Sequence, residues 1–248
     1  MSTRYLQKLQ RNWNKLANGD ALWAILSDPK KKHNKWKLDE FFKTGEKEIS
    51  DVFQELESLG LKVKFGKCLD FGCGAGRLTQ ALAKFFNESI GVDISEKMIQ
   101  LAEIYNLREN CKFFVNEDEN LSLFSDGCFD FIYSSITFQH IRPTYALAYL
   151  RACLRKLSIG GVMVFQITTK EKTNLRSYLK NASPYFLLKA YRLIKGLVCV
   201  DFSNKIEMYF INPEDIEQVV KQEKAEIIDR IDEEVSKVVS SRFFVKRL

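Results

Sequence analysis

A cluster of glycines and a nearby aspartate are the residues whose types and spacing best predict a ligand site. Gly72, Gly74 and Gly76 form a G-x-G-x-G turn directly after the apolar-leaning run 67–71. Glycines let a backbone approach a ligand closely, and the helix that follows offers unpaired N–H groups at its start. Asp93 lies 21 residues after Gly72, where an acid can accept both hydroxyls of a ribose. The spacing therefore predicts a site for a nucleoside-containing ligand.

Asp70 narrows the kind of nucleoside that would bind. It lies two residues before the first glycine, where its negative charge would repel a pyrophosphate but would suit a ligand that carries an ammonium group. A dinucleotide turn has the spacing G-x-G-x-x-G, whereas the third glycine here comes one position earlier. Both features disfavour a nicotinamide dehydrogenase.

Alternating strands and helices are predicted to position these residues. Strands are expected at 67–71, 89–93, 111–115, 129–134 and 162–167, and helices at 76–86, 95–105 and 143–157. Strands separated by helices of this length indicate a parallel α/β sheet with right-handed crossovers. Near the C-terminus, 226–231 and 242–245 would add a closing antiparallel pair.

Helices are predicted before the glycine turn. Apolar residues at steps of three and four indicate a helix over 4–18, a short second helix over 21–26, and a third over 38–59. Asp39 is a candidate cap for the third helix, and Gly60 is its expected stop. These helices are too apolar to stand alone, so they must pack on the sheet or close over it.

The chain is expected to form effectively one domain. Residues 1–60 would be a helical N-terminal cap, and 61–248 the sheet-bearing domain, with a helical lid insert at 171–203 before a sixth strand at 206–211. Three cations in the segment 185–198 share one helical face. We expect that face to meet solvent, with weak contact to a membrane surface as the alternative.

The motifs together resemble a known family, the class I S-adenosylmethionine-dependent methyltransferases of small-molecule type. The resemblance covers roughly residues 60–170, and it rests on the segments Leu69–Arg77, Gly91–Ser95, Asp126–Ser134, Phe138–Ile141 and Leu154–Gly161. It implies a Rossmann-like sheet of seven strands with a reversed last strand and helices on both faces. It also implies S-adenosyl-L-methionine as the cofactor.

The resemblance implies roles for residues near the methionine part of this cofactor. Asp70 would hold the methionine amino end, together with the backbone around Gly72, Cys73 and Gly74. Ser134, at the end of the fourth strand, would line the methionine side.

Other roles implied by the resemblance concern the nucleoside. Asp93 would bind the ribose hydroxyls, and Ile94 would pack against the adenine. Glu117 is the acid that aligns with the family's partner of the adenine amino group, and the N–H of Asp118 could meet the ring. The match departs from the family here, because a small residue, an acid and a small residue are more usual at 116–118.

His140 and its neighbour Gln139 are candidates for a base or for a group that orients the acceptor. His140 is one of two histidines, and it follows the fourth strand at the ligand-facing edge of the sheet. A base contributes about 10²–10⁴-fold when the acceptor must lose a proton. A histidine that only holds its loop by hydrogen bonding is an equally good interpretation. The other histidine, His33, lies in a lysine-rich loop and is expected to face solvent.

Composition bears on compartment and partners. The six cysteines are scattered without a C-x-x-C pair, which predicts buried free thiols in a reducing cytoplasm and no metal site. No apolar run approaches the roughly 20 residues that cross a bilayer, and the first residues contain no apolar signal core. The net charge of +6 is a weak indication of acidic partners.

We therefore expect a cytoplasmic methyltransferase that moves a methyl group to oxygen or nitrogen of a small-molecule acceptor. Aromatic residues in the predicted N-terminal cap and in the predicted lid insert favour an acceptor with apolar or ring character. The alternatives are an RNA or protein methyltransferase, which the positive charge favours, and a non-catalytic partner subunit that binds S-adenosylmethionine. Nucleic acid is disfavoured because the fourth strand ends in 134–137, Ser-Ser-Ile-Thr, and not in an N-P-P-Y-like run.

Overall fold

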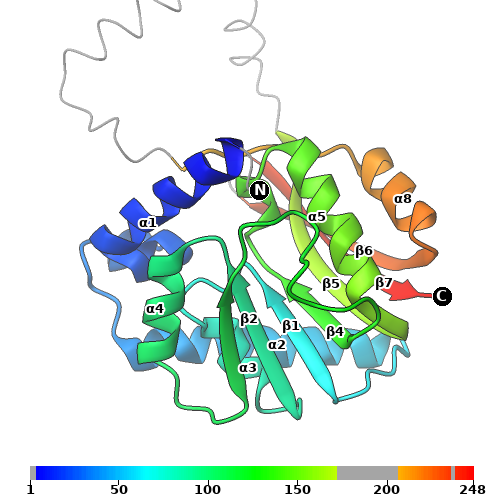
Figure 1. Cartoon of the computed structure of the whole chain (residues 1–248), viewed down its shortest axis with the longest axis horizontal. Coiled ribbons are helices and arrows are strands. Elements are labelled where there is room, and N and C mark those ends of the chain that lie inside the picture. Colours follow the sequence, from blue (N-terminus) through cyan, green and yellow to red (C-terminus); the bar gives the residue numbers. More distant parts are fainter. Residues whose placement is uncertain (1–3, 172–205, 236–237) are drawn as a thin grey trace, which may run out of the picture.

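The computed structural model describes residues 4–171, 206–235 and 238–248, which form a seven-stranded sheet (Figure 1). The strands are β1 (Lys67–Phe71), β2 (Glu88–Asp93), β3 (Cys111–Val115), β4 (Phe129–Ser134), β5 (Leu157–Glu171), β6 (Ala225–Val235) and β7 (Val238–Arg247). Their order is β3-β2-β1-β4-β5-β7-β6, and β7 runs antiparallel to both of its neighbours. The predicted class, a Rossmann-like α/β sheet with a reversed last strand, is confirmed.

Helices cover both faces of the sheet (Figure 1). α2 (Leu38–Ser58), α3 (Arg77–Leu82) and α4 (Glu96–Ile104) pack on one face, and α5 (Pro143–Lys156) and α8 (Pro213–Gln222) pack on the other. Successive side chains of a strand point to opposite faces. Cys68 of β1 therefore packs in the core under α2 and α3, and Leu69 packs in the core under α5 and α8. The structure also describes two short 3₁₀ helices, η1 (Pro29–Lys31) and η2 (Phe138–His140).

A buried ion pair holds α2 against the helix that follows the glycine turn. Arg77, at the start of α3, is 3% exposed and donates to Glu48 of α2 at 2.8 Å. The Tyr133 hydroxyl donates to the other carboxylate oxygen at 2.8 Å. Burial would raise the pKa of Glu48, but the Arg77 guanidinium and hydrogen bonds from neighbouring side chains bring it below its ordinary value. The pair therefore stays ionised and sets where α3 begins.

α1 (Arg4–Ile25) lies across the carboxyl end of the sheet, beside α4 (Figure 1). The Ser95 hydroxyl at the start of α4 donates to Asn14 of α1 at 2.7 Å. The predicted division into two helices becomes a kink, because Asp20 departs from helical geometry with φ −131° and ψ 78°. α1 therefore bends over the region where the glycine turn lies.

Some details of the predicted elements are corrected. α2 begins at Leu38 as predicted, but its cap position is Lys37, and Asp39 lies in its first turn without acting as the cap. α3 ends at Leu82, four residues before its predicted end. The strand expected at 162–167 is longer at both ends, because β5 begins at Leu157, directly after α5, and includes Gly160 with φ +77°.

The strand predicted at 206–211 is wrong. The structure has irregular chain there without sheet pairing, and β7 occupies the edge of β5. The segment is held by isolated backbone bonds, from the N–H of Tyr209 to the carbonyl of Gln139 at 2.7 Å and from Ile211 to Thr168 at 3.0 Å. The helical insert predicted at 171–203 lies outside the described residues, apart from Glu171 at the end of β5.

The strand order reverses between β1 and β4, and this reversal creates the setting for a site. β1 pairs with β2 on one side and with β4 on the other, all three parallel. Connections leave such a point toward opposite faces of the sheet, so a crevice opens outside the carboxyl ends of the strands. No helix among the described residues is long and apolar enough to span a lipid bilayer.

Candidate functional site

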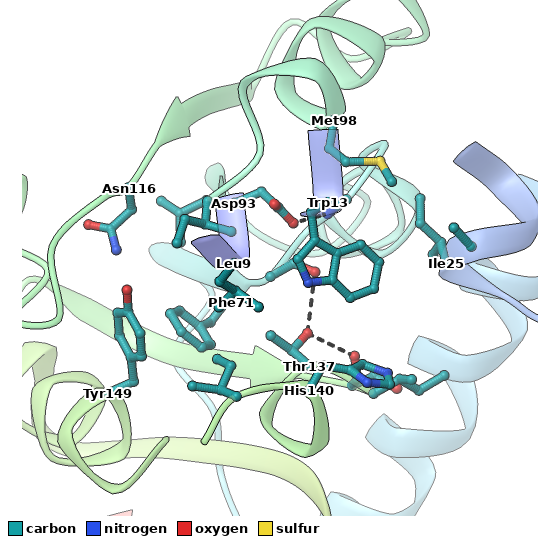
Figure 2. A pocket seen from close by; sticks show the side chains of 18 residues that line it. Leu9, Trp13, Ile25, Phe71, Asp93, Met98, Asn116, Thr137, His140 and Tyr149 are labelled. Atoms are coloured by element: carbon teal, nitrogen blue, oxygen red, sulfur yellow. Dashed lines mark hydrogen bonds between the residues drawn. The ribbon is translucent and has the colours of Figure 1, made fainter. Parts of the chain in front are cut away.

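A cavity lies at the carboxyl ends of β1, β2 and β4, beneath α1 (Figure 2). The space inside it is about 740 Å³, a volume that includes the part open to solvent. Most of its wall is apolar. Its polar side chains are Asp93, Asn116, Ser135, Thr137, His140 and Tyr149.

Two glycines of the turn form the floor of the cavity. Gly72 has φ +80° and Gly74 has φ +52°, a left-handed conformation that glycine adopts without cost. A Cβ on Gly72 would lie 2.2 Å from the Thr137 side chain, and one on Gly74 would lie 2.8 Å from Ile25. Both positions therefore require glycine, as the G-x-G spacing predicts.

Asp93 brings a carboxylate into the cavity at the end of β2. Its Oδ2 accepts from the N–H of Gly74 at 3.0 Å (Figure 2), and its Oδ1 accepts from the N–H of Ser95 at 2.8 Å. Burial raises the pKa of Asp93 to about 6, although these N–H groups oppose the rise. A carboxylate has about four acceptor positions, so Asp93 keeps acceptor capacity for hydroxyl groups of a ligand.

Asn116 provides an unpaired acceptor at the β3 side of the cavity. The residue is 4% exposed, and its Nδ2 donates to the carbonyl of Asp118 at 2.8 Å. Its Oδ1 is buried and has no hydrogen-bond partner in the structure. A buried acceptor without a partner is costly, so this oxygen is suited to a donor group on a ligand. Tyr149 points toward Asn116 across the cavity (Figure 2).

The two acids predicted to contact the adenine, Glu117 and Asp118, lie beside the cavity and do not line its wall. Glu117 accepts from Gln10 of α1 at 2.6 Å. Asp118 accepts from the N–H groups of Asn120 and Ser122 and so closes its own loop. Together with Asn116 they line a shallower depression next to the cavity. The side chain that reaches the cavity is therefore that of Asn116, one position before Glu117.

Asp70 lies below the glycine turn, on the face of β1 opposite to Phe71. It is 1% exposed and accepts a hydrogen bond from the Thr79 hydroxyl at 2.7 Å. Burial raises the pKa of Asp70 to about 7, and the bond from Thr79 opposes the rise. Phe71 contributes to the cavity wall and Asp70 does not. The role predicted for Asp70 at an amino group stays a prediction.

The Cys73 and Ser134 side chains also lie outside the cavity wall. Cys73 is 5% exposed and points into the small core around α4 and β3. The Ser134 hydroxyl donates to the carbonyl of Phe71 at 2.9 Å and ties β4 to β1. The next residue, Ser135, lines the cavity instead.

His140 lies at the opposite end of the cavity from Asn116. Its Nδ1 is 2.8 Å from the carbonyl oxygen of Glu207. A carbonyl can only accept, so Nδ1 donates and Nε2 of the neutral ring carries a lone pair. Burial lowers the pKa of His140, and the bond to Glu207 opposes the change. The ring is therefore held as a neutral hydrogen-bond acceptor.

Gln139 supports His140 from the side of the sheet. Its Nε2 lies 3.2 Å from Nε2 of His140, and its Oε1 accepts from the Thr168 hydroxyl at 2.9 Å. The Thr168 bond orients the amide so that its NH₂ group faces the imidazole. Gln139 thus contacts the candidate base without lining the cavity.

α1 contributes residues that the motifs do not indicate. Leu9, Trp13 and Ile25 line the cavity (Figure 2), although each is far along the chain from the glycine turn. The signal for Leu9 and Trp13 is their common apolar stripe, which was expected to pack on the sheet or close over it. Trp23 and Trp36 instead donate their indole N–H groups to backbone carbonyls.

Part of the chain is similar to a known family. Residues 69–165 match the family described as a methyltransferase domain, which confirms the predicted resemblance over that segment. A malonyl-[acyl-carrier protein] O-methyltransferase of Bacillus cereus is 34% identical over 101 residues, 40% of this chain and 36% of that protein. A ubiquinone biosynthesis O-methyltransferase of Xanthomonas campestris is 27% identical over 99 residues, 39% of this chain and 41% of that protein. The chain thus spans about two fifths of these relatives' length.

A solved structure shares the fold across almost the whole chain. It is magnesium protoporphyrin IX methyltransferase from Synechocystis, with bound S-adenosylhomocysteine. The TM-score is 0.63 at 16% sequence identity, and the match covers 98% of this chain and 99% of that one. At this identity the likeness concerns the fold, and it agrees with the seven-stranded sheet described above.

Proposed function

We propose that this chain, whose residues 69–165 match the methyltransferase domain family, is an S-adenosylmethionine-dependent methyltransferase. Its acceptor would be a hydroxyl or amino group of a small molecule. The observation that carries the proposal is the Asp93 carboxylate, set against the backbone of Gly74 in a cavity at the point where the strand order reverses.

The residues at this end of the cavity fit the cofactor, and we call Gly72, Gly74, Asp93 and Asn116 the donor end. Asp93 has acceptor capacity left for the ribose hydroxyls. The unpaired Oδ1 of Asn116 suits the amino group of adenine, and Ile94 supplies apolar wall beside it. The space over the glycines, which a Cβ would fill, lets the backbone approach the cofactor closely.

His140, Gln139 and Trp13, with the carbonyl of Glu207, form what we call the acceptor end. Bound S-adenosylmethionine supplies an electrophilic methyl group on a sulfonium sulfur. For a hydroxyl acceptor, a C–O bond forms as the C–S bond breaks, and the electron pair of the broken bond stays on sulfur. Nε2 of His140 would take the proton that the hydroxyl loses, exchanging for it the hydrogen bond that its lone pair accepts from the Gln139 amide.

The wall of the cavity supports an acceptor with apolar or ring character. Trp13, Ile136 and Ile141 lie in the wall with His140, and apolar walls with a few polar groups favour apolar ligands whose orientation is fixed by hydrogen bonds. The relatives named above are described as O-methyltransferases, which favours oxygen as the methylated atom.

Calorimetry with S-adenosylhomocysteine tests the donor end, and transfer of a labelled methyl group tests the activity. Asp93→Ala should lose at least tenfold in affinity. The matched control is Asp126→Ala, because that exposed acid pairs with Lys156 away from the cavity. Transfer should be detected with hydroxylated aromatic or lipid-like acceptors. Transfer to polar sugars alone would contradict the proposed acceptor class, and tight binding without any turnover would favour a non-catalytic subunit.

The charge distribution favours a second candidate, a methyltransferase whose acceptor is part of an acidic macromolecule such as RNA. Residues 4–37 hold nine Lys or Arg and two Asp, a net of +7, whereas the whole chain has +6, so the rest carries −1. On α1, four exposed cations fall within about 60° of arc: Arg4, Lys8, Arg11 and Lys15.

Salt-dependent binding of tRNA tests this candidate. Replacing these four cations by Gln should reduce the slope of log affinity against log salt concentration by about 3 to 4 if they contact phosphates. A control with Lys43, Lys47, Lys62 and Lys64 changed to Gln removes the same charge from other exposed positions. Equal effects of the two variants would show that only net charge matters.

Organisation and compartment follow from the same proposal. Residues 1–60 would act as a cap on a single domain of 61–248, since α1 covers the cavity and α2 packs on the sheet. A cytoplasmic location is supported by the cysteines within the described residues, all five of which are free thiols.

A further inference from the structure

The candidate base is assembled from three separate parts of the chain. His140 belongs to η2, the carbonyl of Glu207 belongs to the segment before α8, and Trp13 belongs to α1. We propose that Trp13 is the positioning residue that seats the His140 ring and keeps its Nε2 an acceptor, so that the base is complete only with α1 over the cavity. This inference rests on the proposed methyl transfer, but its test observes the imidazole and not turnover.

Trp13 and Glu207 hold the imidazole at two points. The centroids of the Trp13 and His140 rings are 5.5 Å apart, and their planes meet at 66°. This edge-to-face arrangement is a favoured one for aromatic pairs. The hydrogen bond from Nδ1 to Glu207 fixes the other end of the ring at 2.8 Å. Both rings also line the cavity (Figure 2), where Nε2 accepts from the Gln139 amide until a bound molecule takes the place of that hydrogen bond.

α1 contacts the neighbours of His140 as well. Lys8 pairs with the Glu207 carboxylate at 3.6 Å, and the Tyr5 hydroxyl accepts from the N–H of Arg142 at 2.7 Å. The ion pair is about half exposed on both sides, and such pairs contribute little. Trp13 is the residue of α1 that forms a ring contact with the imidazole, so its removal should have the largest effect.

Burial is the main influence on the protonation of His140. Gln139 and Thr168, which are neutral, support the ring from the sheet side. The charged or titratable groups near it are Lys8, Arg142, Glu207, Tyr5 and Tyr209. The Glu207 carboxylate is already engaged by Lys8 and by the Tyr209 hydroxyl. Replacing the indole by a smaller side chain would admit water to the ring and raise the pKa of His140 toward its ordinary value.

Nuclear magnetic resonance of the full chain can follow this group directly, because the chain has two histidines. The signal of His33 serves as an internal reference. In Trp13→Leu we expect the pKa of His140 to rise toward its ordinary value, because the ring becomes hydrated. Trp13→Phe should restore most of the wild-type behaviour, because it keeps an aromatic ring against the imidazole.

Trp23→Leu is the matched control, because Trp23 lies on the same helix and donates to the carbonyl of Asp28, away from His140. It should leave the His140 titration unchanged. An unchanged titration in Trp13→Leu, or an equal rise in Trp23→Leu, would overturn the proposal.

A measurement on the wild-type chain covers the case in which Trp13→Leu does not fold. The indole signal of Trp13 should shift with the same midpoint as His140, whereas the indole signals of Trp23 and Trp36 should not. A Trp13 indole signal that does not shift as His140 titrates would also overturn the proposal. Lack of methyl transfer would contradict the proposed function and leave these readouts intact.

Discussion

The two ends of the cavity are built differently. At the donor end, the positions of Gly72, Gly74 and Asp93 follow from two neighbouring parallel strands and the turn between β1 and α3. At the acceptor end, Trp13 and His140 meet although 127 residues separate them. The first end depends on local backbone conformation, and the second depends on how a cap helix packs. Damage to the turn should therefore affect the whole molecule, whereas damage to the acceptor end should affect chemistry alone.

The largest effect is expected from Gly72→Ala. The new Cβ would meet Thr137 at 2.2 Å in a backbone with φ +80°, so both strain and overpacking apply, with a loss of about 2–5 kcal/mol in the free energy of unfolding. Urea unfolding measures the loss, and binding of S-adenosylhomocysteine should become undetectable. Gly19→Ala is the control, because a Cβ there has nothing within 4 Å. A Gly72→Ala variant of wild-type stability and affinity would contradict the assignment of the turn.

His140→Ala should separate chemistry from binding. With a hydroxyl acceptor, the rate of methyl transfer should fall about 10²–10⁴-fold, while affinity for S-adenosylhomocysteine changes less than about threefold. Labelled methyl transfer and calorimetry give the two quantities. His33→Ala is the control, since His33 lies in the loop after η1, away from the cavity. If His140→Ala keeps full activity, the residue only holds its loop.

Acid should weaken cofactor binding through Asp93. Its pKa is raised from 3.8 to about 6, so the unliganded protein takes up a proton that the ribose hydroxyls must displace. Affinity for S-adenosylhomocysteine should fall about tenfold for each pH unit below 6. Calorimetry between pH 5 and pH 8 measures this, and Asp93→Asn should be weak and nearly independent of pH. If the affinity of the wild-type chain does not change with pH, Asp93 does not contact the bound cofactor.

The raised pKa of Asp93 predicts that folding stability changes with pH in the opposite direction to cofactor affinity. Between 3.8 and about 6 the folded chain binds more protons at Asp93 than the unfolded chain does. The contribution of Asp93 to stability is therefore present at low pH and is lost as the pH rises through this window. Asp70, whose pKa is raised to about 7, extends the same trend to higher pH.

The smallest effect should distinguish Asn116 from the acid beside it. Asn116→Ala removes the unpaired Oδ1 from the cavity and should lower affinity for S-adenosylhomocysteine about fivefold to tenfold. Glu117→Ala should change it less than twofold, because that carboxylate is engaged with Gln10 outside the cavity. Calorimetry on both variants tests the difference. The reverse order would restore the role that the family resemblance implies for Glu117.

The sequence by itself determined the fold class and most of the donor end. Glycine at 72 and 74 and an acid at 93 are requirements of a strand, a turn and a second strand that lie close in the chain, so local patterns are enough to predict them. The same patterns predicted the strands of the sheet and the reversed β7. They could not predict that 206–211 stays outside the sheet, because that depends on which strand occupies the edge of β5.

Only the tertiary structure decided which neighbouring side chain faces the cavity. Asn116 reaches it where the acid at 117 was expected, and Ser135 reaches it where Ser134 was expected. Adjacent residues differ by which way the backbone turns them, and that depends on packing at the strand end. The tertiary structure also placed Trp13 against His140, because the sequence shows an apolar stripe on α1 but not the surface that the stripe covers. Residue spacing predicts local geometry, whereas contacts between distant segments depend on the packing of the whole chain.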